Sequence, residues 1–208
     1  MEWREKHYFI STDKSLLEVD RIHAFLSNKA YWCLSIPKTV ILSAINNSLC
    51  FGVFDNHDGN LLQIGFARIV TDKATFAWLC DVYVEETYRE QGLATWLMKC
   101  VMNHPELQNL RRICLATKDA HGLYQKFGFE VTTTPGNWME IKDNDLYKKK
   151  AAKQEISSAI SDAIAYGIDV SMIESNLQIS PQERLERHES AFELAKELRQ
   201  AGEQLSKT

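Results

Sequence analysis

Apolar residues in the first two thirds of the chain recur with two different periods, and each period predicts a type of element. Alternating or continuous apolar runs rich in β-branched and aromatic residues predict strands. We expect strands at residues 49–55, 61–70, 76–84, 111–117, 129–133 and 138–141, after a short extended segment at 7–11. Apolar residues three and four positions apart predict helices. We expect helices at residues 16–26, 38–46, 92–100 and 121–127.

The connections between these strands predict how they pair. Short polar turns join the three strands between residues 49 and 84, which predicts an antiparallel meander. The strand at 111–117 follows a helix, and such a crossover predicts a parallel pair with a right-handed connection. The last two strands are expected to form a hairpin around Pro135-Gly136-Asn137. The fold class is α/β (α+β), a mixed and mostly antiparallel sheet of six to seven strands with helices on both faces.

The composition of the chain changes after residue 142. Strand-forming residues become rare, and residues 146–166 predict a helix that stops at Gly167. Ser180, Pro181 and Glu183 match a capping box with proline at the first helical position, which opens a helix to about residue 201. We therefore predict a sheet domain at residues 1–142 and a helical hairpin at residues 143–208.

The second tail helix carries an apolar stripe that must be buried somewhere. The stripe consists of Leu185, Phe192, Ala195 and Leu198. It can pack on the sheet domain, on the other tail helix or on a second copy of the chain. We favour packing within the chain, and a homodimer is the alternative.

Composition and charge narrow the class of protein. The 208 residues are 45% hydrophobic and 25% charged, which is ordinary for a globular protein. No run approaches the roughly 20 apolar residues of a membrane span, and the first residues show no secretory signal, so we expect a cytoplasmic protein without membrane partners. A net charge of −4 argues against broad, non-specific binding to nucleic acid.

The five cysteines are widely spaced, and no Cys-x-x-Cys pair occurs. This spacing gives no support to a zinc ribbon or a dithiol redox motif, and we expect no metal site. Cys50, Cys80 and Cys114 fall in apolar runs that predict strands, where a thiol is expected to behave as a small buried hydrophobe.

Candidate chemistry begins where the strand at 76–84 ends. The turn from Arg89 to Ala94 leads directly into the helix at 92–100. The first N–H groups of such a helix are free and lie at the positive end of its dipole, which suits a phosphate. Gly92 allows the backbone to come close to a ligand. The turn lacks the lysine and Ser/Thr of P-loop NTPases, and an ordinary strand–helix turn is the alternative.

Two motifs resemble those of the GNAT acyltransferases. Arg89-x-x-Gly92-x-Ala94 is similar to the family's pyrophosphate-binding pattern, Arg/Gln-x-x-Gly-x-Gly/Ala. Residues 117–129, TKDAHGLYQKFGF, resemble the family element Asn-x-x-Ala-x-x-Leu-Tyr-x-Lys-x-Gly-Phe. A helix and a strand separate the two motifs, as in the family. The resemblance covers roughly residues 5–142 and leaves the helical tail outside.

The resemblance implies a GNAT-type fold with a splayed central parallel pair, and acetyl-CoA as the cofactor. The backbone of residues 90–95 would bind the pyrophosphate of coenzyme A. The strand end at 82–84 would bind the pantetheine arm and polarise the thioester carbonyl. Thr117 replaces the family's usual asparagine, which leaves any amide contact there in question. The implied cofactor-binding residues are Val82, Tyr83, Val84, Arg89, Glu90, Gln91, Gly92, Leu93, Ala94, Thr95, Thr117 and Lys126.

The resemblance also implies catalytic residues. Tyr124 matches the tyrosine whose hydroxyl points at the thioester sulfur, so we expect it to donate a proton or a hydrogen bond to the departing thiolate. An alkylamine acceptor is almost fully protonated at pH 7, and a base would remove its proton. Asp81 is the first candidate for this base, and pairing with Arg68 on the neighbouring strand is the equal alternative. The further candidates are Glu85, Glu86, His23 and His121.

The acceptor pocket of this fold is built by the first two helices, their connection and the final hairpin. The corresponding residues are Tyr31, Trp32, Ile36 and Trp138. These aromatic residues suggest a small-molecule amine or a peptide N-terminus, acetylated by direct attack in a ternary complex because no cysteine is placed as an acyl carrier. The alternatives are a GNAT-fold module that binds acyl-CoA without turnover, and an acetyltransferase of charged tRNA, which would need a basic face.

Overall fold

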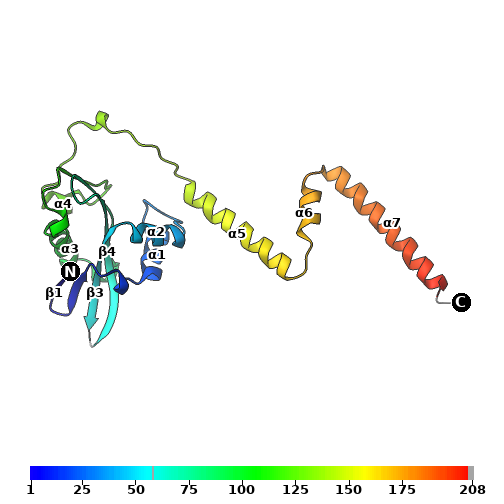
Figure 1. The fold of residues 1–208 in the computed structure, drawn as a ribbon, viewed down its shortest axis with the longest axis horizontal. Helices are drawn as coiled ribbons and strands as arrows, with labels where there is room; N and C mark the ends of the chain where they lie inside the picture. Colours follow the sequence, from blue (N-terminus) through cyan, green and yellow to red (C-terminus); the bar gives the residue numbers. More distant parts are fainter. Residues whose placement is uncertain (58, 206–208) are drawn as a thin grey trace. The chain divides into compact units, whose positions relative to one another are not determined.

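The structure is a computed structural model that describes residues 1–57 and 59–205. The chain divides into two compact units, Met1–Ala151 and Ala152–Thr208, and each is described by itself. The first unit contains the whole sheet, and the second contains only helices and their connections (Figure 1).

The strands described in the first unit form one six-stranded sheet, in which they lie in the order of the chain. The strands are β1 (Glu2–Glu5), β2 (Tyr8–Ser11), β3 (Leu49–His57), β4 (Asn60–Thr71), β5 (Phe76–Val84) and β6 (Arg112–Cys114). All neighbouring pairs are antiparallel except β5 and β6, which are parallel. The predicted fold class, a mixed and mostly antiparallel sheet with one parallel pair, is therefore confirmed.

Helices cover both faces of this sheet, as predicted. The helices of the first unit are α1 (Val19–Asn28), α2 (Lys38–Asn46), α3 (Leu93–Met102) and α4 (His121–Gln125), with single turns of 3-10 helix between them. On one face α3 buries Leu97 and Met98 completely in a core with residues of β3 to β5. On the other face α1 and α2 bury Ile22 and Ile41 in a second core that includes Phe66 of β4.

The predicted final hairpin is wrong, because residues 129–141 contain no strand. β6 is only three residues long and offers a short edge for pairing. Three consecutive threonines are followed by a 3-10 turn at Pro135–Asn137, and proline has no N–H for a ladder. Several apolar side chains of this segment are exposed, among them Val131 at 70% and Met139 at 97%.

A hairpin at the amino terminus adds β1, which the sequence pattern did not predict, whereas β2 corresponds to the extended segment expected at residues 7–11. β1 pairs with β2, and β2 pairs with β3, both antiparallel. β1 reads Glu-Trp-Arg-Glu and has only one residue that packs inward, since Trp3 stacks on Phe51 with ring centroids 5.9 Å apart. A four-residue strand with one apolar side chain gives too weak an alternation to be recognised.

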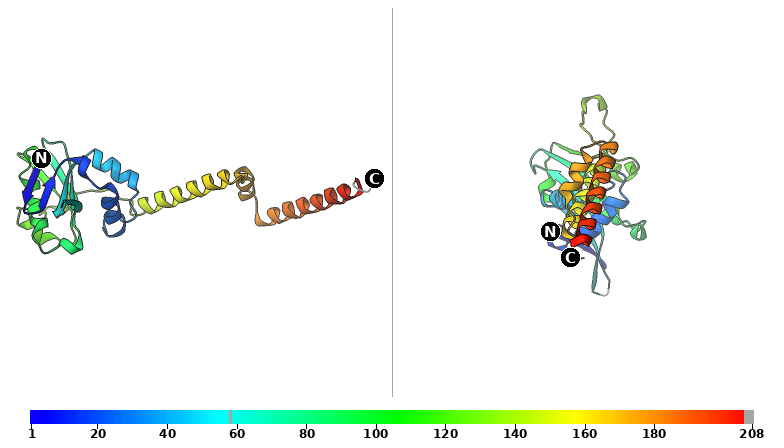
Figure 2. Two further views of the ribbon diagram at one scale, coloured as in Figure 1. Left: turned by 90° about the horizontal axis from the view of Figure 1, so that it is seen from below. Right: turned by 90° about the vertical axis from the view of Figure 1, so that its right-hand side faces the viewer.

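The second unit and the segment that leads into it are helical, as predicted, but they contain three helices. These are α5 (Leu146–Ala165), α6 (Val170–Leu177) and α7 (Pro181–Leu205), drawn in yellow to red in Figure 2. The capping box is present, because Ser180 N–H donates to Glu183 Oε2 at 2.8 Å and Glu183 N–H donates to Ser180 Oγ at 3.2 Å.

The apolar stripe of α7 is not covered by residues of its own unit. Leu185, Phe192 and Leu198 are between 61% and 65% exposed. Packing of this stripe against the other tail helix, as in a hairpin, is therefore not seen, and a homodimer stays a prediction. None of the helices in the described part of the chain combines the length and the apolar character needed to cross a bilayer.

Candidate functional site

The parallel pair of strands separates early. β6 pairs with β5 only at Phe76, Ala77 and Trp78. From Leu79 to Val84 the same edge of β5 has no partner in β6, so its backbone N–H and C=O groups lie outside the ladder on that side. Unpaired backbone groups next to a strand end can bind an extended ligand as an additional strand would bind.

A bulge in β5 lies beside this opening. Phe66 of β4 faces Tyr83, whereas Arg68 faces Cys80, so two residues of β5 lie opposite one residue of β4. Asp81 is one of these two residues and has a positive φ of 55°. The side chain of Tyr83 points into the core under α1 and α2. Tyr83 is 5% exposed there, and its ring stacks on Phe25 with ring centroids 3.7 Å apart. Only the backbone of Tyr83 is therefore placed to meet a ligand.

The amino end of α3 has the geometry of an anion site. Gly92 is its N-cap, with a left-handed φ of 81°, and no side chain caps the first turn. The first intrahelical bond is Trp96 N–H to Gly92 O at 3.0 Å, which leaves the preceding N–H groups at the helix end without an intrahelical acceptor. A Cβ at Gly92 would meet nothing within 4 Å, so the space in front of the turn is open.

The side chains of this turn are held by neighbouring elements. Gln91 Oε1 accepts a hydrogen bond of 2.8 Å from the hydroxyl of Tyr8 on β2. Arg89 Nε donates to Val84 O at 3.3 Å. Sequence reasoning missed Tyr8, because its contact with Gln91 spans 83 positions and no local motif announces it.

Tyr124 lies on α4 and is 8% exposed. Burial, with smaller contributions from Tyr31 and Asp119, raises the pKa of its hydroxyl to about 12. Thr117 closes the turn that leads into this helix, since its Oγ1 accepts a hydrogen bond of 3.1 Å from the N–H of the N-cap residue, Ala120. Lys126 is exposed at the end of α4. The second motif therefore builds a turn and a short helix that holds a buried phenol.

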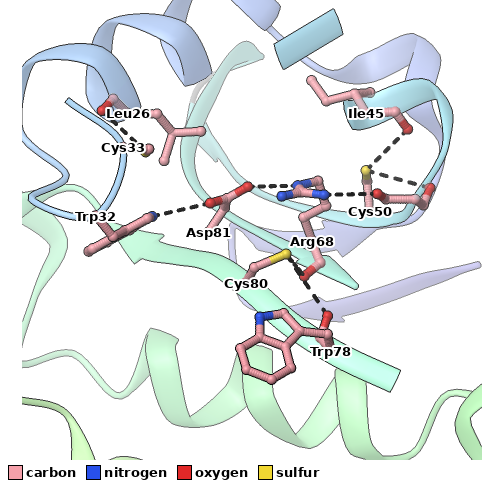
Figure 3. Close-up of polar contacts among 10 residues, drawn as sticks. Leu26, Trp32, Cys33, Ile45, Cys50, Arg68, Trp78, Cys80 and Asp81 are labelled. Carbon is pink, nitrogen blue, oxygen red and sulfur yellow. Dashed lines mark hydrogen bonds and ion pairs between the residues drawn. The ribbon is translucent and has the colours of Figure 1, made fainter. Parts of the chain in front are cut away.

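Asp81 forms an ion pair with Arg68, the alternative that the sequence left open. Arg68 Nε donates to Asp81 Oδ2 at 2.6 Å, and the two side chains are 17% and 12% exposed (Figure 3). Asp81 Oδ1 accepts a hydrogen bond of 3.1 Å from Trp32 Nε1. Arg68 Nη1 also donates to Ser48 Oγ at 3.1 Å. With both oxygens engaged, the carboxylate is poorly placed to take a proton from an amine.

The other candidates for the base differ in whether their side chains are already paired or are exposed. Glu85 pairs with Lys29 at 3.3 Å, and His23 Nε2 lies 3.0 Å from Ile36 O. Glu86 is exposed in the turn after β5. His121 is exposed on α4 and lines the same pocket as Tyr124. Of these side chains, only that of His121 shares a pocket with the phenol.

A pocket of about 340 Å³ lies between β6, α4 and the segment after it. Its aromatic lining residues are Trp78, His121, Tyr124, Phe129 and Trp138. Thr117 and Cys114 also line it. Sequence reasoning assigned neither Trp78 nor Phe129 to a site. The signal for Trp78 was its position in an apolar run, and Phe129 closes the second motif, where it was given no role. Tyr124 and Trp138 therefore line the same pocket.

The four predicted acceptor residues do not form one group. Tyr31 and Trp32 are 49% and 44% exposed and meet edge to face, with ring centroids 5.0 Å apart. Ile36 is 8% exposed in the core under α1 and α2. Trp138 lies against Trp78, with ring centroids 6.3 Å apart. Tyr31 contacts the segment that leads into α4, since its hydroxyl accepts a hydrogen bond of 3.0 Å from Lys118 N–H.

Three cysteine thiols surround the Arg68–Asp81 pair and are kept protonated. Burial raises the pKa of Cys50 to about 11 and the pKa values of Cys33 and Cys80 to about 12. Cys80 Sγ lies 3.3 Å from Arg68 O, and Cys50 Sγ lies 3.6 Å from Ile45 O (Figure 3). Protonated, buried thiols are poor nucleophiles.

These thiols predict loss of stability at alkaline pH. The folded-state pKa values of Cys50 and Cys80 lie above their ordinary value of 9.0, so their contribution is complete below about pH 9 and is lost as pH rises toward 11 and 12. We expect the free energy of unfolding to fall by about 1–3 kcal/mol per pH unit in this window. Urea unfolding followed by tryptophan fluorescence measures it. A Cys50→Ala, Cys80→Ala variant should show a shallower slope, and an equal slope would contradict the assignment.

Comparison with known proteins identifies the family. Residues 46–131 match the family described as acetyltransferase (GNAT) domain. A Gibberella zeae protein named "Putative acetyltransferase" is 31% identical over an alignment that covers 60% of this chain and 79% of that protein. The chain belongs to the GNAT acetyltransferase family. An "Uncharacterized N-acetyltransferase" of Pyropia yezoensis is 26% identical over 60% of this chain and 71% of its own length.

A solved structure extends the likeness of this GNAT chain to three dimensions. It is a crystal structure from Xanthomonas campestris pv. campestris, titled as "a putative acetyltransferase belonging to the gnat family". It is 46% identical, has a TM-score of 0.64 and covers 69% of this chain and 99% of its own. GNAT acetyltransferases use acetyl-CoA, so the family identifies the cofactor. Acetyl-CoA is therefore the ligand against which the open strand edge and the uncapped helix end are compared below.

Proposed function

We propose that residues 1–142 form an acetyl-CoA-dependent N-acetyltransferase domain, which transfers an acetyl group to a primary amine by direct attack in a ternary complex. The observation that carries the proposal is one continuous backbone path. The end of β5, which has no partner on the β6 side, is followed by a turn that contains Gly92 in a left-handed conformation. This turn leads into the uncapped first turn of α3. This path offers strand-like hydrogen bonds for an amide-containing arm and helix N–H groups for a diphosphate.

The chain's residues fit this cofactor. The backbone of residues 90–95 would hold the diphosphate, since no Cβ fills the space at Gly92. The backbone of residues 82–84 would hold the pantetheine arm. Acetyl-CoA supplies, when bound, a thioester whose acyl carbon an amine can attack, with a thiolate as the leaving group. A backbone N–H fixed at the strand end would stabilise the charge that develops on the acyl oxygen.

Tyr124 would assist the leaving group by hydrogen bonding. A thiol ordinarily has a pKa of about 8.5, whereas burial raises the pKa of Tyr124 to about 12. Complete proton transfer from this phenol to a thiolate is therefore unfavourable by a factor of roughly 10³. The hydroxyl stays protonated throughout the working pH range and donates a hydrogen bond to the developing thiolate, which takes its proton from solvent.

The acceptor would be a small amine with an apolar or aromatic body, or a peptide N-terminus. Two groups of aromatic residues are available to contact such an acceptor. One is the exposed pair Tyr31 and Trp32, and the other is Trp78 and Trp138 in the pocket. A chain of net charge −4 is compatible with a cationic amine. His121, which shares the pocket with Tyr124, is better placed than the paired Asp81 to accept the amine proton, directly or through water.

Thiol release tests the activity. Purified protein given acetyl-CoA and a broad panel of amines should release free thiol above the rate of spontaneous hydrolysis, and mass spectrometry should find an added acetyl group on one class of amine. Tight binding of coenzyme A without thiol release would instead favour a non-catalytic acyl-CoA sensor.

Replacing Gly92 by alanine should weaken cofactor binding. An L-residue at its φ of 81° is strained by about 1–2 kcal/mol, and the new methyl group would stand in the open space before the first N–H groups. We expect the Kd for acetyl-CoA, measured by isothermal titration calorimetry, to rise at least about tenfold. Gly167→Ala is the matched control, since Gly167 also has a positive φ, of 89°, and open space around its Cβ position. Equal affinities of the two variants for acetyl-CoA would show that this turn does not bind the phosphates.

A further inference from the structure

Three side chains of types that can ligate a metal ion meet at one end of the first strands, outside the site described above. His7 lies in the turn between β1 and β2, and Asp55 and His57 lie near the end of β3. Asp55 and His57 are two residues apart on one strand, so their side chains share a face of the sheet. One ligand atom from each of the three residues lies within 4.8 Å of the other two.

The pairing of β2 with β3 fixes this arrangement. Tyr8 faces Asp55 in the ladder, and Asn56 N–H donates to His7 O at 2.9 Å. The rings of His7 and His57 meet edge to face with centroids 5.2 Å apart. The backbone therefore brings together residues that are 50 positions apart in the chain, which is why no local motif predicted the cluster.

The carboxylate at the centre of the cluster has an unpaired oxygen. Asp55 Oδ1 is buried and has no hydrogen-bond partner among the described residues. It lies 3.9 Å from His7 Nε2, which is too long for a hydrogen bond. Buried polar atoms almost always have a partner, and an exception calls for an explanation such as an ion. A cation between the carboxylate and the imidazole would satisfy this oxygen.

We propose that His7, Asp55 and His57 form a binding site for one divalent transition-metal ion. Two imidazoles and one carboxylate suit borderline ions such as Zn²⁺, Co²⁺ or Ni²⁺ better than Ca²⁺ or Mg²⁺, which prefer oxygen ligands. Around an ion with bonds of about 2.0–2.1 Å, tetrahedral ligand atoms lie about 3.3 Å apart. The cluster must contract modestly to reach this spacing.

The site adjoins the proposed cofactor-binding turn without being part of it. Tyr8 follows His7 directly, and their rings lie 4.0 Å apart. The hydroxyl of Tyr8 donates to Gln91 Oε1 at 2.8 Å. An ion at His7 would hold the β1–β2 turn, and with it the residue that orients Gln91. The site does not depend on acetyl transfer, and it differs from our expectation from the sequence that the chain has no metal site.

Calorimetric titration of the full, untagged chain with Zn²⁺, and separately with Co²⁺, tests the proposal. We expect saturable binding of one equivalent, and a visible absorption spectrum of the Co²⁺ form typical of nitrogen and oxygen ligands. Binding should weaken toward acidic pH, because imidazole ligands must be deprotonated. An ion at a hundredfold its Kd should raise the Tm by roughly 5–10 °C.

Single substitutions identify the ligands. His7→Ala, His57→Ala and Asp55→Asn should each weaken binding at least about tenfold. His188→Ala, at an exposed histidine of α7, is the matched control and should bind as the wild type does. His57→Ala changes an exposed side chain, so its Tm without metal should fall by no more than about 2 °C, which separates lost binding from lost folding. No saturable binding, or equal affinity in all variants, would overturn the proposal.

Discussion

Replacing Tyr124 by phenylalanine is expected to lower kcat by about 10²–10³ and to leave the Kd for acetyl-CoA nearly unchanged. The substitution removes one hydroxyl group and keeps the ring that packs on Phe129, with centroids 5.9 Å apart. If the hydroxyl donates a hydrogen bond only to the developing thiolate, the loss falls on the transition state, so it appears in kcat and not in cofactor binding.

The same variant distinguishes catalysis from stability. Tyr124 is 8% exposed and its hydroxyl makes no hydrogen bond with the described residues, so its removal should change the Tm by no more than about 2 °C. Tyr166→Phe, at a residue 89% exposed, is the control and should retain full activity. Single-turnover thiol release and calorimetry measure the two effects. A kcat within about twofold of wild type would end the proposed role of the hydroxyl.

The pH profile gives an independent check on Tyr124. Because burial raises its pKa to about 12, the phenol keeps its proton up to about pH 11. The activity of the wild type should therefore show no loss from phenol ionisation near pH 10, the ordinary value for tyrosine. A fall in kcat near pH 10 that is absent from Tyr124→Phe would show that the hydroxyl is more exposed in the working enzyme.

Replacing Arg68 by methionine is expected to destabilise the first unit by about 3–5 kcal/mol. Methionine keeps much of the apolar stem but leaves the carboxylate of Asp81, which is 12% exposed, without its cation. Asp81→Asn should cost a similar amount, because it leaves the buried guanidinium uncompensated. Asparagine tolerates the positive φ of 55° at this position, so the change tests charge rather than backbone strain. Urea unfolding measures each loss.

A double variant and an exposed pair serve as controls. Arg68→Met with Asp81→Asn should be more stable than either single variant, because no unpaired charge remains. Lys73→Ala, which breaks a pair of the same type at 2.9 Å between side chains that are 54% and 42% exposed, should cost no more than about 1 kcal/mol. Equal losses for Arg68→Met and Lys73→Ala would mean that burial of the central pair has no energetic consequence.

The same variants decide whether Asp81 is a base. If Asp81 only fixes the bulge through Arg68 and Trp32, Asp81→Asn should keep kcat within about tenfold when measured well below its Tm. A loss of 10²–10⁴ that the double variant does not recover would identify Asp81 as the base instead. His121→Ala is the informative partner, because His121 lines the pocket that contains Tyr124.

Local patterns predicted the elements around the candidate site well. The strand at 76–84, the helix that opens at Gly92 and the helix at 38–46 appear with nearly the predicted bounds, because each has a strong apolar period and a clear turn or cap. The hairpin at 129–141 does not form, although its residues favour strands. A strand needs a partner, and β6 provides a paired edge of only three residues.

The sequence by itself determined the motifs at residues 89–94 and 117–129, the glycine at the helix start and the short helix that carries Tyr124. These depend on neighbours within a few positions, and local backbone preferences are sufficient to define them. Only the tertiary structure decided that Asp81 pairs with Arg68, that Trp138 lies against Trp78, and that His7 meets Asp55 and His57. These contacts join residues far apart in the chain, and the register of the strands, which no single segment encodes, sets which side chains meet.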